Sequence, residues 1–433
     1  MKRVLIISPY FPPSNTPDMQ RVRTSLPYFQ EFGWNADVVV VHEDYSEMSK
    51  DELLLQSIPA GTIVYKVAAL SRKWTAKFGL GSIALRSMFF YKKMVDKLLK
   101  DNHYDLIYFS STQFPVCVMC VWWKKKFQIP YVIDMQDPWH SDYYQDKPRD
   151  QWPPKYWFSY RMNKFLEQVT LKHSNGLIAV SQKYIDDLKA RYPIIKSIPE
   201  SVITFGAFAP DIEIAVANRD SFPKLLIEGF INIVYIGRGG MDMHKAVEPV
   251  FKALQAGLLS QPELFGKFRF HFIGTSYAAK GKGVPTIYPL AESMGLQELV
   301  SESTDRISYY HALVTLKDAD ALFLPGSDDP AYTPSKIYPY LLTQKAMLAV
   351  FNTRSPATEV LRNSADGTEI VIFDKADAVS RISRILTKWA NKEFKPIHLR
   401  PGFENFSAKN LTGKQVDLFM KVLEHFEKTD TNA

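Results

Sequence analysis

The chain has 433 residues, more than one ordinary hydrophobic core accommodates, so two domains are expected. Because 46% of its residues are apolar, a disordered chain is excluded. The sequence contains no run of about 18 apolar residues, so no membrane-spanning helix is predicted. The net charge of +7 is unevenly placed, because residues 71–100 hold eight Lys or Arg and one Asp. This concentration predicts a local anionic partner and not a generally basic protein.

The N-terminal residues MKRVLIISPYFPP predict a β-strand and not a signal peptide, because a short apolar run leads into prolines without a small-residue cleavage site. The two cysteines, Cys117 and Cys120, have the spacing of a redox pair. They lie in an apolar run with no second pair and no nearby histidine, so we interpret them as core residues. That points to a reducing, cytoplasmic compartment.

Apolar runs of strand length alternate with helical patterns through the first half of the chain. Residues 19–32 have helical spacing and end at Gly33, and residues 82–100 form a second clear helical pattern. Such alternation predicts a doubly wound parallel sheet. The strands expected there are 3–8, 36–41, 62–67, 106–110, 131–134, 177–180 and 202–205.

Residues 207–229 lose this rhythm, and a second alternating series follows them. We expect an N-terminal domain at 1–208, a linker at 209–229 and a C-terminal domain at 230–411, with the last helix, 412–428, packing back on the first domain. The strands expected in the second domain are 231–237, 268–273, 321–324, 347–350 and 369–373. The fold class is therefore α/β, with two Rossmann-like doubly wound domains facing across a cleft.

The stretch DALFLPGSDDPAYTPSKIYPYLL predicts a buried strand, a polar loop and a helix beginning at Thr333 and Pro334. The free N–H groups of residues 335–337 would then point into the loop, where an anion such as phosphate could bind. A capped helix after a strand is also common without any ligand, and this interpretation stays open. Asp318 and Asp320, just upstream, resemble a metal-binding pair but are interpreted as structural, so no metal site is expected.

A second candidate is the turn in YIGRGGMDMHK, which follows the first strand of the second domain. Its glycines would allow close approach of the backbone to a ligand, and Arg238 and Lys245 add two cations. The alternative is a glycine turn with two solvated bases. A dinucleotide fingerprint fits poorly, because the pattern is Gly-x-Gly-Gly. A sugar-nucleotide diphosphate fits better, since its departure needs positive charge.

Three pieces of the chain resemble the retaining GT-B glycosyltransferases of family 4 (GT4), in the family's order. They are the first strand with PYFPP and a polar loop containing Arg21, then YIGRGG with a lysine seven residues after its arginine, and last RISYYHALVTLKDADALFLPGSDDPAYTPSKIYPYLL. The resemblance implies transfer of a sugar with retention, with a nucleotide-sugar as co-substrate and no cofactor or metal.

The resemblance also implies roles for particular residues. The donor diphosphate would be held by Arg238, Gly239, Lys245, Ser335 and Lys336. The donor sugar and the loop over it would involve Ser14, Asn15, Asp328, Asp329 and Tyr332. The catalytic candidates are Asp137 and His140 in YVIDMQDPWHSD, although a loop carboxylate that caps a helix is an equally simple interpretation of Asp137.

The chain departs from the family at two positions. The family's paired glutamates, eight residues apart, align with Ala331 and Pro339, neither of which offers a side-chain acceptor to a sugar hydroxyl. A proline inside a helix also removes one backbone hydrogen bond, so we expect a kinked or short helix there. These departures favour a scaffold that binds nucleotide or glycan without turnover as the main alternative. A GT-B-fold nucleotide-sugar epimerase and a phosphorylase are the others.

The basic segment suggests a second partner. We expect it to bind an anionic membrane surface, because bases beside exposed aromatic side chains suit lipid headgroups, while a solvated helix face is the alternative. The acceptor would then be a glycan or lipid-linked, as in surface polysaccharide synthesis, and the enzyme peripheral on the inner face of the membrane. Nucleic acid is not expected. The patch comprises Arg72, Lys73, Trp74, Lys77, Arg86, Lys93 and Lys97.

Overall fold

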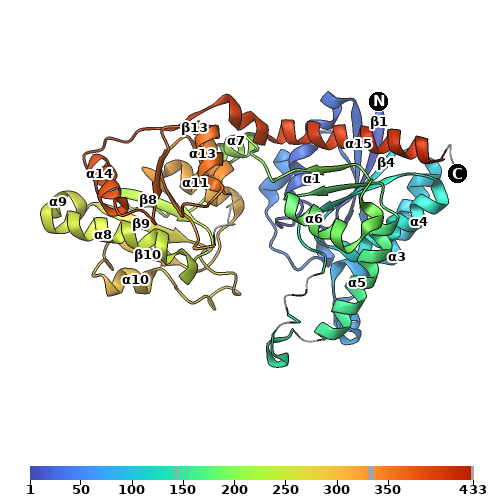
Figure 1. Ribbon diagram of the computed structural model, residues 1–433, viewed down its shortest axis with the longest axis horizontal. Helices are drawn as coiled ribbons and strands as arrows, with labels where there is room; N and C mark the ends of the chain where they lie inside the picture. The colour runs from blue at the N-terminus through green and yellow to red at the C-terminus, as the bar shows by residue number, and fades with distance from the viewer. Residues whose placement is uncertain (141, 143, 146, 154, 330–335, 431–433) are drawn as a thin grey trace. The chain divides into compact units, whose positions relative to one another are not determined.

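The computed structural model describes residues 1–430 apart from 141, 143, 146, 154 and 330–335, and divides into two compact units. The first unit combines Met1–Gly206 with Ala408–Ala433, and the second is Ala207–Ser407. Each unit contains one parallel sheet covered by helices, as the colours of Figure 1 allow the reader to follow along the chain. The α/β class and the two doubly wound domains expected from the alternating pattern are confirmed.

The sheet of the first unit has seven parallel strands in the order β3-β2-β1-β4-β5-β6-β7. Strand β1 begins both halves of the sheet, because the chain passes from it to β2 on one side and returns to β4 on the other. The strands are β1 (Lys2–Ile7), β2 (Trp34–Val41), β3 (Ile63–Val67), β4 (Leu106–Ser110), β5 (Tyr131–Met135), β6 (Gly176–Ala179) and β7 (Glu200–Val202).

Alternate residues of these strands point to two separate cores, as a pleated sheet requires. Leu5 and Ile7 face one core, while Val4 and Ile6 face the other. The helices of this unit are α1 (Gln20–Ser25), α2 (Arg72–Thr75), α3 (Ile83–Asp101), α4 (Val118–Phe127), α5 (Tyr156–Lys172), α6 (Gln182–Arg191) and α15 (Ala408–Asp430).

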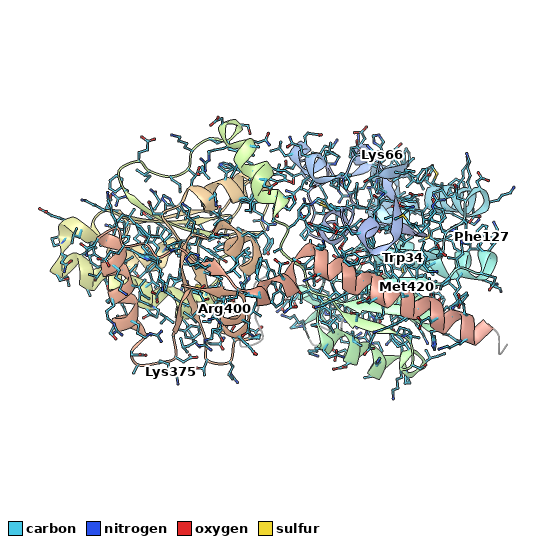
Figure 2. All side chains as sticks on the ribbon, turned by 90° about the horizontal axis from the view of Figure 1, so that it is seen from above. Trp34, Lys66, Phe127, Lys375, Arg400 and Met420 are labelled. Carbon is cyan, nitrogen blue, oxygen red and sulfur yellow. The ribbon has the colours of Figure 1, made fainter. Side chains whose placement is uncertain are left out.

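Helix α15 is the C-terminal helix, and it packs on the sheet of the first unit. The ring of Phe419 contacts those of Phe29, Trp34 and Tyr108, with centroid distances of 6.3, 5.5 and 5.1 Å. Figure 2 shows α15 running past the labelled Trp34. This aromatic cluster buries a large apolar area. It therefore stabilises α15 on the first unit after the chain has passed through the second.

The second unit has a six-stranded parallel sheet in the order β10-β9-β8-β11-β12-β14, and a small antiparallel pair, β13 with β15. Its strands are β8 (Ile231–Ile236), β9 (Phe268–Ile273), β10 (Val300–Ser303), β11 (Ala321–Pro325), β12 (Ala346–Phe351), β13 (Ala365–Asp366), β14 (Glu369–Ile372) and β15 (His398–Leu399). Its helices are α7 (Pro210–Ala217), α8 (His244–Ser260), α9 (Pro262–Phe265), α10 (Tyr288–Ser293), α11 (Tyr309–Asp318), α12 (Ile337–Thr343), α13 (Ala357–Ser364) and α14 (Ala378–Ala390).

Residues 209–229, expected to be a linker, are instead part of the second unit and contain α7. The helix begins with Pro210 at its first position, where the missing N–H costs nothing. Its buried Asp211 accepts hydrogen bonds of 2.9 Å from the hydroxyls of both Tyr309 and Tyr310 on α11. The mixed polarity of this segment therefore reflects a docked helix with a buried polar contact.

Two further local expectations can be compared with the structure. The last strand of the first sheet ends at Val202 and not at residue 205, because the carbonyls of Ile203 and Thr204 accept hydrogen bonds from Arg21. Helix α12, which contains Pro339, is short at seven residues, as the proline predicts. Among the described residues, no helix combines the length and the hydropathy needed to cross a bilayer.

Candidate functional site

In each unit the polar residues described below lie at the carboxyl ends of the strands, where the order of the strands in the sheet reverses. We call this position the switch point. In the first sheet this point lies between β1 and β4, and in the second between β8 and β11. Loops after neighbouring strands diverge there and leave space for a ligand. We describe the two edges separately.

The edge of the first sheet is held by a buried ion pair between Arg21 and Asp134. The Arg21 Nε lies 2.6 Å from Asp134 Oδ2, and both side chains are almost fully buried. The same carboxylate oxygen accepts a hydrogen bond of 2.7 Å from the hydroxyl of Ser110. Because Arg21 also donates to the Ile203 and Thr204 carbonyls, it connects α1 with the ends of β5 and β7.

Asp18 connects the loop after β1 with the loop after β4. Its Oδ2 accepts hydrogen bonds from the hydroxyl of Ser111 at 2.6 Å and from the backbone N–H of Thr112 at 3.1 Å. The amide of Gln136, at the end of β5, donates to the Asp18 carbonyl at 3.0 Å. Asp18 therefore fixes the loop whose other members, Ser14 and Asn15, were expected to lie near the donor. Ser14 is buried and Asn15 partly buried in the structure.

Asp137, a catalytic candidate, is exposed at this edge. Partial loss of water around its carboxyl and, second, the negative charge of Asp18 raise the pKa of Asp137 above the ordinary value. A carboxyl group with a raised pKa at the carboxyl edge of a parallel sheet is a candidate for proton transfer or hydrogen bonding with a hydroxyl group of a ligand.

His140, the other catalytic candidate, is buried in a polar network around Glu167 of α5. The His140 Nδ1 lies 3.0 Å from Glu167 Oε1, which also accepts hydrogen bonds from Arg191 at 2.7 Å and from the Tyr192 hydroxyl at 2.9 Å. Burial raises the pKa of the Glu167 carboxyl, but the hydrogen bonds and charges of His140 and Arg191 outweigh this and hold the pKa below its usual range. These contacts are those of a residue that fixes α5 against the loop after β5.

At the edge of the second sheet, Arg238 follows β8 and is paired with Asp242. The guanidinium donates through Nη1 to Oδ1 at 3.0 Å and through Nη2 to Oδ2 at 2.6 Å. The hydroxyl of Ser327, after β11, donates to the same Asp242 Oδ2 at 2.7 Å. Hydrogen bonding from Arg238 lowers the pKa of Asp242. Asp242 therefore links Arg238, after β8, to Ser327, after β11, at the carboxyl ends of these two strands.

Lys336 lies at the same edge, just before α12, and its side chain reaches back to β8. A Cβ added to Gly237 would fall on the Lys336 ammonium, which also lies 5.4 Å from the centroid of the Tyr235 ring. Burial, with repulsion from Arg306 and Arg238, lowers the pKa of Lys336 to about 8. The Lys336 ammonium therefore lies in an electropositive place with little water, where a bound anion would stabilise its charge.

The remaining sequence candidates of the second unit are placed as follows. Gly239 is required by packing, because a Cβ there would come within 2.8 Å of the Thr286 hydroxyl and 3.0 Å of the Thr275 Cβ. Lys245 is exposed in the first turn of α8. Asp328 and Asp329 are exposed in the loop after β11. Ala331, Tyr332, Thr333, Pro334 and Ser335 lie outside the described residues.

The basic patch of the first unit differs in one respect from its expected form. Arg86 was expected on the exposed face of α3, but it is 5% exposed and donates hydrogen bonds to the carbonyls of Leu70 at 2.9 Å and Tyr45 at 3.0 Å. Those two loop carbonyls need a donor, and the arginine supplies it. Arg72 is exposed and ion-paired with Glu47. The other members are exposed, namely Lys73, Trp74, Lys77, Lys93 and Lys97.

Four residues with these contacts were not singled out from the sequence: Glu167, Asp242, Arg306 and, as an individual residue, Asp18. Arg306 had a signal that could have been used, because it follows β10 in a turn at the carboxyl edge of the sheet. Glu167 had none, since a glutamate within a helix is usually solvated. Among the described residues, no group of three or more His, Cys, Asp or Glu is arranged to hold a metal ion.

Residues 20–203 match the sequence model of Glycosyltransferase Family 4. A glycosyltransferase from Rickettsia africae has a similar structure, with a TM-score of 0.52 at 12% identity, covering 98% of this chain and 99% of the other. An α,α-trehalose-phosphate synthase from Burkholderia xenovorans gives a TM-score of 0.52 at 12% identity over 99% of both chains. The N-terminal domain of a Candida albicans trehalose-6-phosphate phosphatase gives 0.59 at 13%, covering 98% and 97%. No curated protein matches the chain by sequence.

The two doubly wound units, with polar residues at both switch points, define the fold as that of GT-B glycosyltransferases. Residues 20–203, which form most of the first unit, match glycosyltransferase family 4, the family that the sequence motifs resemble. The similarity to these solved structures supports the fold. At such low sequence identities it carries nothing about donor or acceptor.

Proposed function

We propose that this protein is a glycosyltransferase that transfers a sugar from a nucleotide-sugar donor to a glycan or lipid-linked acceptor. The family match and the fold support the coarse class. The donor would bind to the second unit, with its diphosphate at the cation cluster of Arg238, Arg306 and Lys336. The acceptor would bind to the first unit at the edge that carries Asp18 and Asp137.

The single observation that carries the donor site is the position of the Lys336 ammonium, which fills the space that a Cβ on Gly237 would need at the carboxyl end of β8. Two guanidinium groups act on this ammonium, and burial removes the water that would otherwise stabilise it. A diphosphate would reverse this penalty, because its oxygens would pair with all three cations. The same positive charge would stabilise the nucleoside diphosphate as it leaves the sugar, which is where a transferase needs electrostatic help.

The mechanism follows from this charge distribution. With the three cations on the diphosphate, its departure from the sugar would need no metal. A diphosphate oxygen would assist the acceptor hydroxyl on the same face of the sugar, so the anomeric configuration would be retained. Asp137, with its raised pKa, would accept a hydrogen bond from a sugar hydroxyl at the first edge. His140 would act as a positioning residue, because its Nδ1 is already engaged by Glu167.

A scaffold without turnover is the second candidate, and Pro339 favours it. Helix α12 carries this proline where the family resemblance expects a glutamate that binds the donor. A chain of this kind would bind nucleotide or glycan and transfer nothing. A nucleotide-sugar epimerase of the GT-B fold is a third candidate, which would use the same nucleotide-sugar site.

The donor site can be tested by calorimetric titration of UDP, GDP, ADP, CMP and NAD into the wild type, Lys336→Met and the control Lys375→Met, which changes an exposed lysine of the same unit. One nucleoside diphosphate should bind the wild type and the control equally and bind Lys336→Met at least ten-fold more weakly. Binding of NAD alone would contradict the proposal. Release of nucleotide from the corresponding nucleotide-sugar then separates a transferase from a scaffold, which binds without turnover.

A further inference from the structure

Two segments of the first unit that contain no acidic residue come together at its surface. Residues 53–95 and 151–166 each lack Asp and Glu, although the chain has 46 acidic residues in all. The ammonium of Lys155 donates to the carbonyls of Ala76 at 3.3 Å and Lys77 at 3.0 Å. The ring of Phe158, in the first turn of α5, lies 3.6 Å from where a Cβ on Gly79 would be. The start of α5 therefore rests against the segment that follows α2, as Figure 1 also shows.

Large apolar side chains project from this junction into solvent. Trp74 is 70% exposed and Phe78 74%, and on α5 Trp157 is 61% and Phe165 63% exposed. Leaving such side chains in water forgoes about 1.5–3 kcal/mol each, and a cluster of them usually marks a contact surface. We call this the aromatic–basic surface, and it comprises Trp74, Lys77, Phe78, Leu80, Lys155, Trp157, Phe158, Arg161 and Phe165.

Helix α5 exposes large aromatic side chains and buries two polar ones. Trp157, Arg161 and Phe165 are spaced by four residues and so share its outer face, while Glu167 and Thr170 are buried. Its cations lie over the aromatic rings, since the Arg161 guanidinium is 6.0 Å from the ring centroid of Trp157. Lys77 is placed in the same way, 5.1 Å from that of Trp74. Each of the two tryptophans is thus accompanied by a base.

We infer that the aromatic–basic surface docks the protein on an anionic lipid membrane. Aromatic rings at a lipid interface insert among the headgroups, while the neighbouring bases pair with lipid phosphates. A second copy of the chain is disfavoured as occupant, because two acid-free basic surfaces would repel each other. The sequence of residues 71–100 suggested a membrane partner by itself. Of the patch expected from the sequence, the aromatic–basic surface keeps Trp74 and Lys77 and adds α5 to them, whereas Arg86 is buried.

The test is co-sedimentation of the full chain with vesicles of phosphatidylcholine alone, or of phosphatidylcholine mixed with phosphatidylglycerol, at low and high salt. The basic variant is Lys77→Gln with Arg161→Gln, and its control is Lys375→Gln with Lys388→Gln on the second unit. The aromatic variant is Trp74→Ser with Trp157→Ser, and its control is Trp122→Ser with Leu259→Ser, which removes two exposed apolar side chains elsewhere.

Wild type and both controls should bind the anionic vesicles more tightly than the neutral ones, to which they should bind weakly through the aromatic side chains. At low salt the basic variant should bind about 30-fold more weakly, since each base near an anionic surface contributes about five-fold. This difference should disappear at high salt, where charges are screened. The loss in the aromatic variant should persist at high salt, because insertion of apolar rings is not screened.

Equal binding to neutral and anionic vesicles would overturn the inference, as would a basic variant that binds like the wild type. So would sedimentation velocity that shows a dimer lost in the aromatic variant, which would make a second copy the occupant. Single-stranded oligonucleotide binding that is lost in the same variants would assign the surface to nucleic acid. None of these measurements contains a nucleotide-sugar, so their failure is distinct from a failure of the proposed reaction.

Discussion

The ammonium of Lys336 occupies the space that a Cβ on Gly237 would need, so the absence of a side chain at position 237 is what admits this lysine to the end of β8. The pair comes from different loops, one after β8 and one before α12. Because glycine leaves its Cα uncovered, the lysine can approach the strand end and lie beside Arg238, where the proposed donor diphosphate would bind.

Gly237→Ala should therefore remove the anion site without unfolding the second unit. The added methyl displaces the flexible end of Lys336 and also comes within 2.7 Å of the Tyr235 hydroxyl, which must shift slightly. The melting temperature should therefore fall by a few degrees, while affinity for the preferred nucleoside diphosphate should fall at least ten-fold. Calorimetric titration measures the second effect. A matched check is the double variant Gly237→Ala with Lys336→Met, which should bind no more weakly than Lys336→Met alone, because both changes remove the same interaction.

Binding of the nucleoside diphosphate should depend on pH through Lys336, whose pKa is about 8 in the unliganded protein. Below that pH the ammonium is charged and affinity should not change through this group. Above it, affinity should fall by up to about ten-fold per pH unit, because the anion must then bind together with a proton. Titrations across this range on wild type and Lys336→Met provide the measurement. A slope that survives in Lys336→Met would assign the titration to another group.

The same pKa makes a prediction for the unliganded protein. The unfolded chain keeps the Lys336 proton up to the ordinary lysine value of 10.5, whereas the folded chain releases it near 8. The unfolded state binds more protons in that window, so the free energy of unfolding should rise with pH between about 8 and 10.5, relative to Lys336→Met. Urea denaturation at both ends of the window checks this. Equal pH profiles for the two proteins would contradict the burial of the ammonium.

Glu167→Gln should destabilise the first unit by about 2–3 kcal/mol, because it leaves the partly exposed Arg191 without its carboxylate. The pKa of Glu167 is held below its usual range, so its contribution is present above about pH 4.5 and is lost as the pH falls through the lower, folded-state pKa. Urea denaturation at pH 7 and in acid should show a steeper acid loss for wild type than for Glu167→Gln. The exposed Glu393→Gln should behave as wild type.

Asp134→Ala should cost about 3–5 kcal/mol in the free energy of unfolding, since it leaves the buried guanidinium of Arg21 unpaired. The exposed pair of Lys183 and Asp187 gives the control, and Asp187→Ala should change stability by less than about 1 kcal/mol. Chemical denaturation measures both. If Asp134→Ala proved as mild as Asp187→Ala, the ion pair would not be what fastens α1 to the sheet.

The sequence alone determined the fold class and much of the second candidate site. Strand-length apolar runs separated by helical patterns have few structural solutions, so the two doubly wound sheets followed from local information. Arg238, just after a strand, and Lys336, just before a helix, could be selected because they stand in motifs that resemble one family. Pro339 predicted a short helix through its missing N–H, a property of the residue itself, and α12 is short.

Only the tertiary structure decided which charges meet. Asp242 and Arg306 are far from Lys336 in the chain, and nothing local marks them as its neighbours. Arg86 has the helical spacing of a surface base, yet it is buried because two loop carbonyls need a donor. Residues 207–229 have the composition of a linker, but Asp211 finds two tyrosine hydroxyls on α11 and the segment docks. Burial and pairing depend on contacts across the fold, and hydrophobic periodicity carries no information about them.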